Sequence, residues 1–224
     1  MCHAFKTPTR LLTAAALAAV LATTLFAQTM VVYKAQPNSK VRLEGTSTIH
    51  DWTIEGKIVG GELKLDPSVT IDPSQKTISG LKDGKLPAEV FVRIPVRTLK
   101  SGTTKMDNVM LQAFKADQNQ YTNIEYRLID LTLKEPHAPG SPFQFQAKGT
   151  LKIAGVTRTN LMMITMDRAG ENKLKTIGST NLKMTDFGMQ PPVLLGILST
   201  GDDVKVFFEW LTAIPAIPSA EPAK

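Results

Sequence analysis

Alternating apolar and polar residues recur along most of the chain. The longest run covers residues 143–153, where apolar or small residues alternate with polar ones. A period of two places the apolar side chains on one face of a β-strand, so this run predicts a strand with one dry and one wet face. The pattern recurs at 90–96 and at 204–210. A further run begins at 124 and changes parity after Leu128, which predicts a β-bulge there.

Residues 106–114 follow the period of a helix instead. Their apolar side chains are spaced by three and four residues, which places them on one helical face. Thr103 or Thr104 can cap the start of this helix, and Asp107 lies in its first turn. About eight antiparallel strands with one short helix predict an all-β fold, a closed or nearly closed β-barrel. The apolar helical face consists of Met106, Val109, Met110, Ala113 and Phe114.

The first 27 residues have the composition of an export signal. Lys6 and Arg10 precede an uncharged apolar run that ends at Ala27. This arrangement predicts a signal peptide that is cleaved near Ala27, and therefore a periplasmic location. An uncleaved N-terminal anchor that extends to Val32 is the alternative.

The remaining chain contains no linker that would divide it, so we expect one folded domain. The end of the chain is rich in Pro and Ala and shows no periodicity, which is typical of a loose tail. The predicted segments are a signal peptide at 1–27, an N-terminal extension at 28–36, a barrel domain at 37–213 and a flexible tail at 214–224.

Composition excludes several classes of function. Hydrophobic residues make up 42% of the chain and charged residues 21%, which is typical of a globular protein. The net charge of +6 is scattered and does not favour a nucleic-acid partner. The single cysteine, Cys2, lies in the predicted signal peptide, so the fold has no cysteine for a disulfide, a zinc site or a catalytic thiol.

His50, Asp51 and Trp52 form the most conspicuous polar motif. Neighbouring residues on a strand point to opposite faces, so His50 and Asp51 cannot easily share an acid–base site. We favour structural roles, with Trp52 closing the base of the barrel and His50 held by hydrogen bonds. The other histidines are His3, in the predicted signal peptide, and His137, in a loop. We therefore expect no catalytic residue, no metal site and no cofactor.

Four stretches, in this order, resemble the YceI-like proteins, which are exported, lipocalin-like antiparallel barrels whose members bind polyisoprenoid lipids. The resemblance extends over about residues 37–213, and its most recognisable part is GTLKIAGVTR. The first stretch, GTSTIHDW, is similar to the opening motif of a His-Asp-Trp branch of the family. Asn160 stands where the resemblance leads us to expect an apolar residue. The four stretches are 45–52, 105–115 followed by 122–126, 149–158 and 183–188.

The resemblance implies an exported binding or carrier protein that holds a long-chain apolar lipid, such as a polyisoprenoid or a quinone, inside the barrel. From the residues alone, a hollow barrel and a barrel filled by side chains are equally open. The alternatives are a filled-barrel structural or interaction module of the cell envelope and, less favoured, an envelope hydrolase. The oligomeric state stays open, with a homodimer as one arrangement.

The apolar faces supply the residues that we expect to contact the lipid. Met106 and Met110 form the expected lid, because methionine adapts to irregular apolar shapes. In the segment 161–166 we place the parity of Met162 inward, since the other parity is flanked by polar residues. The predicted walls are Val92, Ile94, Phe143, Phe145, Leu151, Met162, Ile164, Val206 and Phe208.

Overall fold

The computed structural model describes residues 29–194 and 197–216 of the chain. The predicted signal peptide at 1–27 and most of the predicted tail, from 217 onward, lie outside the described residues. The described helices are α1 (Thr104–Ala113) and two short 3-10 helices, η1 (Val96–Thr98) and η2 (Thr185–Phe187).

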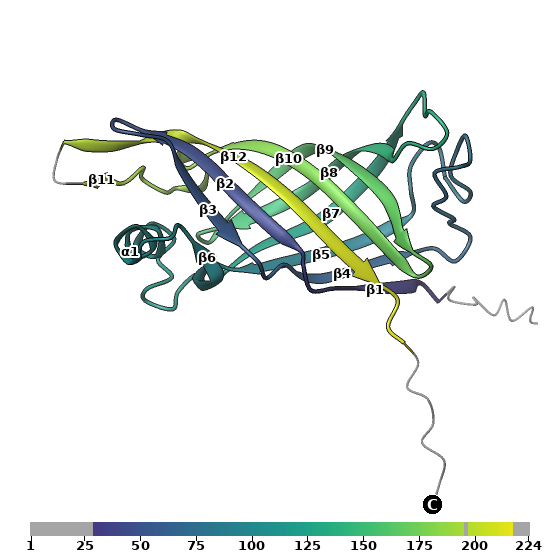
Figure 1. Cartoon of the computed structure of the whole chain (residues 1–224), viewed down its shortest axis with the longest axis horizontal. Helices are drawn as coiled ribbons and strands as arrows, with labels where there is room; N and C mark the ends of the chain where they lie inside the picture. The colour runs from purple at the N-terminus through teal and green to yellow at the C-terminus, as the bar shows by residue number, and fades with distance from the viewer. Residues whose placement is uncertain (1–28, 195–196, 217–224) are drawn as a thin grey trace, which may run out of the picture.

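The strands form one antiparallel sheet that closes on itself (Figure 1). The order β1-β4-β5-β7-β8-β9-β10-β12 becomes a ring because β12 pairs back onto β1, with Lys34 opposite Ala213. Strands β2, β3 and β6 continue the sheet from another part of β12. The predicted all-β barrel with one α-helix is therefore confirmed. The strands are β1 (Val31–Ala35), β2 (Lys40–Ser47), β3 (Trp52–Gly56), β4 (Gly60–Leu65), β5 (Ala88–Pro95), β6 (Leu99–Lys100), β7 (Asn123–Lys134), β8 (Phe143–Ile153), β9 (Val156–Gly170), β10 (Lys173–Lys183), β11 (Val193–Leu194) and β12 (Leu198–Ala213).

The hydrophobic pattern locates the longest strands well. The alternating run at 143–153 coincides with β8, where buried positions alternate with exposed or half-buried ones. The parity change in β7 is a bulge, because the register against β8 shifts between Leu128 and Asp130. Both observations follow from the same rule, that a strand inside a barrel wall turns every second side chain toward the interior.

Strand β1 corrects the predicted start of the domain. We expected residues 28–36 to be an extension, yet β1 lies among them and pairs with both β4 and β12. Its five residues are too few to display a period, and they lie only three residues after the apolar run of the predicted signal peptide. The barrel domain therefore begins at or before Val31, and this short strand closes the ring.

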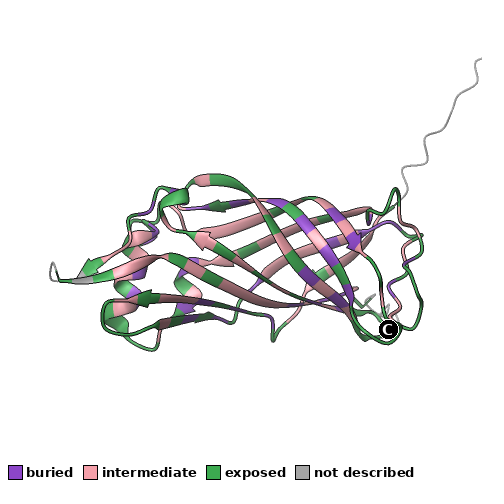
Figure 2. Cartoon of the chain, turned by 90° about the horizontal axis from the view of Figure 1, so that it is seen from above, coloured by how far each residue is buried: buried purple, intermediate pink, exposed green. Residues whose placement is uncertain are grey.

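One end of the barrel is filled by side chains. Phe143 and Phe145 on β8 are 0% exposed. The loops between β4 and β5 and between β7 and β8 lie at this end of the barrel (Figure 1). The ring of His137 stacks on Phe143 with centroids 4.0 Å apart, and its Nε2 lies 3.2 Å from the Pro73 carbonyl oxygen. In Figure 2 the buried stretches of the strands gather toward this end. We refer to it as the closed end.

Helix α1 lies at the opposite end, beside the β2–β3 hairpin and β11 (Figure 1). Thr103 is its N-cap residue, but the Thr103 side chain makes no capping hydrogen bond. Asp107 anchors the helix instead, because its Oδ1 accepts hydrogen bonds from the Ser101 backbone N–H at 2.8 Å and the Ser101 hydroxyl at 2.7 Å. Lys100 Nζ lies 3.4 Å from Asp107 Oδ2. These contacts tie the first turn of α1 to the end of β6.

Replacing Asp107 with asparagine is expected to lower the free energy of unfolding by about 1 kcal/mol at neutral pH. The hydrogen bond from the Ser101 backbone lowers the pKa of Asp107 below its usual 3.8. The stabilisation is thus present above pH 3.8 and is lost as the pH falls through the lower pKa of the folded state. Urea unfolding of both proteins across this range measures the difference. A gap that persists unchanged into acid would contradict the assigned role.

Candidate functional site

A cavity of about 720 Å³ lies inside the barrel and extends from α1 to Met166 and Trp210, beside the closed end. Inward-facing residues of the wall here, including Val92, Leu128 and Val206, are only half-buried, although they lie inside the barrel. Inward residues at the closed end are fully buried instead. The barrel is therefore filled at one end and hollow at the other, which combines the two arrangements that the sequence left open. We refer to this space as the lumen.

The lumen brings together most of the predicted wall residues and leaves two of them out. Phe143 and Phe145 do not line it, because they pack in the closed end. Alternation places their side chains inward correctly but does not give their height in the barrel. Whether the others contact a ligand stays a prediction. The predicted wall residues that line the lumen are Val92, Ile94, Leu151, Met162, Ile164, Val206 and Phe208.

Helix α1 presents its apolar face to the lumen, as the helical period predicts. Met106 and Met110, the predicted lid residues, both line the lumen, and Met110 is only 7% exposed. The helix lies across the end of the barrel and not within its wall (Figure 1). Helix α1 therefore covers this end of the lumen, and its action as a lid stays a prediction. The same face also contributes Val109, Ala113 and Phe114.

Three glycines on the inner wall each lie under an aromatic ring. A Cβ atom at Gly178 would lie 2.5 Å from the ring of Phe208, so any larger residue would push that ring inward. The missing side chains let the rings lie against the wall, which keeps the lumen open. The ring of Tyr126 lies over Gly149 in this way, and its burial raises the pKa of the Tyr126 hydroxyl to about 12. The pairs are Gly45 with Trp52, Gly149 with Tyr126, and Gly178 with Phe208.

The His-Asp-Trp motif lies at the end of the barrel nearer α1. Trp52 borders the lumen near the β2–β3 hairpin, where its Nε1 donates to the Thr46 carbonyl oxygen at 3.0 Å. The expectation that Trp52 closes the base of the barrel is therefore wrong. His50 is exposed, and its Nδ1 lies 2.9 Å from the Asp51 carbonyl oxygen. The Ser47 hydroxyl donates to the His50 carbonyl oxygen at 2.7 Å, so this hydroxyl serves the hairpin.

Charged side chains occur only at the rim of the lumen among its described lining residues. Asp51, Lys105 and Lys183 are all exposed and lie at the α1 end. In residues 29–194 and 197–216, no group of three or more His, Cys, Asp or Glu side chains could hold a metal ion. Of the helices in the same residues, none has the length and apolar character to cross a membrane. The lumen is thus an apolar chamber with its charges at the opening.

Sequence reasoning missed part of the wall. Strands β2 and β3 are too short for their alternation to stand out in the sequence. The inward face of β10 includes Thr176, Gly178 and Thr180, which hide its apolar period. Trp210 is the most informative of the residues without a predicted role, because it is 4% exposed and lines the lumen. The alternation at 204–210 could have assigned it, since it shares the parity of Phe208. The missed wall residues include Val41, Leu43, Ile54, Leu182 and Val204.

A family model for the YceI-like domain matches residues 29–210 of the chain. The chain belongs to the YceI-like family. The matched region includes β1, in agreement with the earlier start of the domain, and extends to Trp210. Assignment to a His-Asp-Trp branch stays a prediction from the sequence.

Solved structures of other proteins share this YceI-like fold. BcnA of Burkholderia cenocepacia is 16% identical with a TM-score of 0.56, over 77% of this chain and 95% of that one. A polyisoprenoid binding domain from Saccharophagus degradans, implicated in plant cell wall breakdown, is 12% identical with a TM-score of 0.58, over 84% and 100%. The YCEI protein of Campylobacter jejuni is 16% identical with a TM-score of 0.50, over 73% and 85%. No curated protein matches the chain.

Proposed function

We propose that this YceI-like protein is an exported carrier that binds a long-chain apolar lipid, a polyisoprenoid, in the lumen. The lumen itself carries the proposal, because apolar side chains from the strands and from α1 surround about 720 Å³. Pockets of this size and composition are typical of small-molecule binding sites. The similar domain from Saccharophagus degradans, described as polyisoprenoid binding, supports the same ligand class.

Burial of the apolar chain drives binding in this proposal. Each Å² of apolar surface removed from water contributes about 25 cal/mol, so affinity grows with the length of chain that the lumen holds. The charged rim residues Lys105 and Lys183 stay in solvent, where a polar group that remains outside can meet them. The protein acts by holding the lipid and not by chemical conversion.

Titration of the delipidated protein with a fluorescent long-chain polyprenol tests this function. We expect saturable binding of one molecule per chain, displaced by unlabelled long-chain polyprenol and poorly by a short isoprenoid alcohol. The chain-length dependence separates burial in the lumen from adsorption to the surface. Failure of the protein to take up the polyprenol would favour the structural or interaction module.

Export is the second part of the proposal. The basic residues Lys6 and Arg10 before an uncharged apolar run support it. We expect the protein recovered from the periplasm to begin near Gln28. N-terminal sequencing measures this, and a periplasmic protein that begins with Met1 would contradict cleavage.

A further inference from the structure

The deepest part of the lumen contains two polar atoms in an otherwise apolar wall. Trp210 on β12 lies opposite Thr176 on β10 in the antiparallel register, and both residues line the lumen. They are 4% and 5% exposed, respectively. Within the described part of the chain, neither Trp210 Nε1 nor Thr176 Oγ1 has a hydrogen-bond partner. We refer to this pair as the polar floor.

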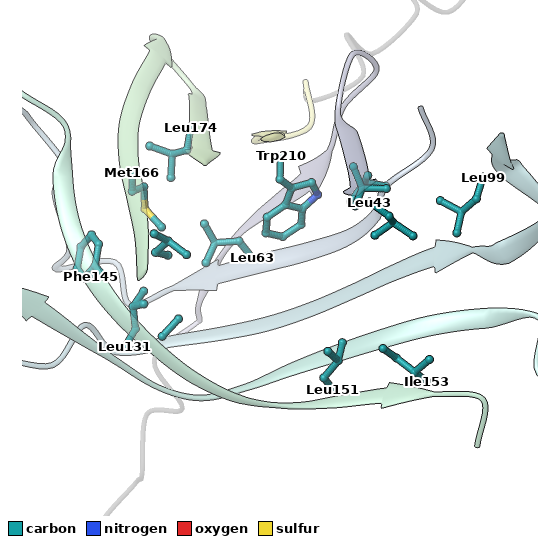
Figure 3. Packing of buried hydrophobic residues seen from close by; sticks show 14 of the residues in the cluster. Leu43, Leu63, Leu99, Leu131, Phe145, Leu151, Ile153, Met166, Leu174 and Trp210 are labelled. Atoms are coloured by element: carbon teal, nitrogen blue, oxygen red, sulfur yellow. The ribbon is translucent and has the colours of Figure 1, made fainter. Parts of the chain in front are cut away.

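Apolar side chains surround the polar floor. Met166 lies opposite Thr176 on the other neighbouring strand, and Leu63 and Leu131 line the lumen nearby. Figure 3 shows the indole nitrogen of Trp210 on the side of the ring toward Leu43, away from Met166 and the closed end. The donor therefore faces along the lumen, where the end of a bound molecule can reach it.

A buried donor without an acceptor is unfavourable, because it has lost its hydrogen bonds to water and gained none in return. An indole N–H can only donate, and a threonine hydroxyl can donate as well. Each of these groups can therefore donate one hydrogen bond to an acceptor oxygen, such as a carbonyl oxygen. The chemistry of the floor therefore selects an acceptor oxygen.

The charge of that acceptor follows from the distribution of charges around the lumen. Asp51, Lys105 and Lys183 are the charged residues among the described lining, and all three are at the exposed rim. A phosphate or carboxylate at the floor would be desolvated with no cation beside it, which is strongly unfavourable. A neutral oxygen avoids this cost.

We propose that the polar floor binds the neutral carbonyl oxygen of a long-chain lipid, with Trp210 Nε1 as the donor and Thr176 as a second polar residue on the adjacent strand. This inference rests on the proposed lipid-binding function and adds the class and the orientation of the ligand. The carbonyl end enters first, and the hydrocarbon chain runs past Phe208 toward α1. A lipid with an anionic end binds in the opposite direction or more weakly.

Paired isoprenoid probes test the floor. The delipidated protein is titrated with geranylgeranylacetone, a linear isoprenoid ketone, and with the hydrocarbon of the same chain that lacks the oxygen. We expect the ketone to bind about tenfold more tightly, since one net hydrogen bond is worth about that factor. Trp210→Phe is expected to reduce this preference to about one, and the nearly isosteric Thr176→Val is expected to reduce it less.

A matched control removes a different buried hydroxyl of the lumen. Tyr126 lines the lumen nearer α1, and its hydroxyl also has no partner within the described residues. Tyr126→Phe is expected to retain the preference for the ketone. Loss of the preference in Tyr126→Phe but not in Thr176→Val or Trp210→Phe would place the acceptor elsewhere and overturn the proposal.

The indole N–H resonances give a readout that does not depend on affinity. The chain has two tryptophans, and Trp52 already donates to Thr46, so only the Trp210 signal is expected to shift when the ketone replaces the hydrocarbon. Equal binding of both probes, with no shift of Trp210, would reject the polar floor while the carrier function stands. Binding of neither probe, together with no uptake of the long-chain polyprenol, would reject the carrier function itself, and the floor with it.

Discussion

Truncation of Phe145 to alanine is expected to lower the free energy of unfolding by about 3–5 kcal/mol. The ring is 0% exposed and packs in the closed end, outside the lumen. Its removal leaves a void that the surrounding side chains cannot fill. Urea unfolding of the delipidated protein measures the loss.

Phe208→Ala is the matched control for this change. Phe208 also faces inward from its strand, but its ring is half-buried and borders the lumen. Its truncation only enlarges a space that already exists, so the loss of stability is expected to be clearly smaller than for Phe145→Ala. Equal losses at the two positions would mean that the barrel is packed alike at both ends.

Ala147→Trp is expected to abolish uptake of a fluorescent polyprenol while the protein stays folded. Ala147 lines the lumen from β8, between Leu131 and Met162 on the neighbouring strands. An indole at this position occupies the space that the lipid would fill. In a fully packed interior the same change would overpack the core and cost about 1–3 kcal/mol.

Lys148→Trp provides the control, because Lys148 is the next residue on the same strand and is exposed. It adds the same indole to the outer surface and is expected to leave uptake unchanged. Uptake is measured by fluorescence titration and the fold by circular dichroism. Normal uptake by a folded Ala147→Trp variant would show that the lipid binds somewhere other than the lumen.

The sequence predicts which face of each long strand is buried, because that property is local. Alternation along β8 identifies Phe145 and Leu151 as inward residues, and both are buried. It cannot tell that Phe145 lies in the closed end and Leu151 beside the lumen. Height in a barrel depends on the register between strands distant in sequence, which no local period contains.

Strand β1 and the polar floor show two further limits. Val31 begins a strand that is defined by its pairing with β4 and β12. Its short apolar sequence resembles the end of the predicted signal peptide. Trp210 continues an apolar alternation, so the sequence pattern treats it as a hydrophobic residue and gives no sign of a hydrogen-bond donor. Only the structure shows that the Trp210 indole N–H is buried in the lumen wall and that Thr176 lies opposite Trp210 on β10.

Native mass spectrometry of the protein purified without detergent tests most directly whether the lumen holds a lipid. We expect a second species that is heavier than the bare chain by the mass of one lipid, and we expect solvent extraction to release an isoprenoid of that mass. The Ala147→Trp variant, purified in the same way, is expected to give the bare chain. If the parent protein also gives only the mass of the bare chain and its extract contains no lipid, the carrier function is contradicted.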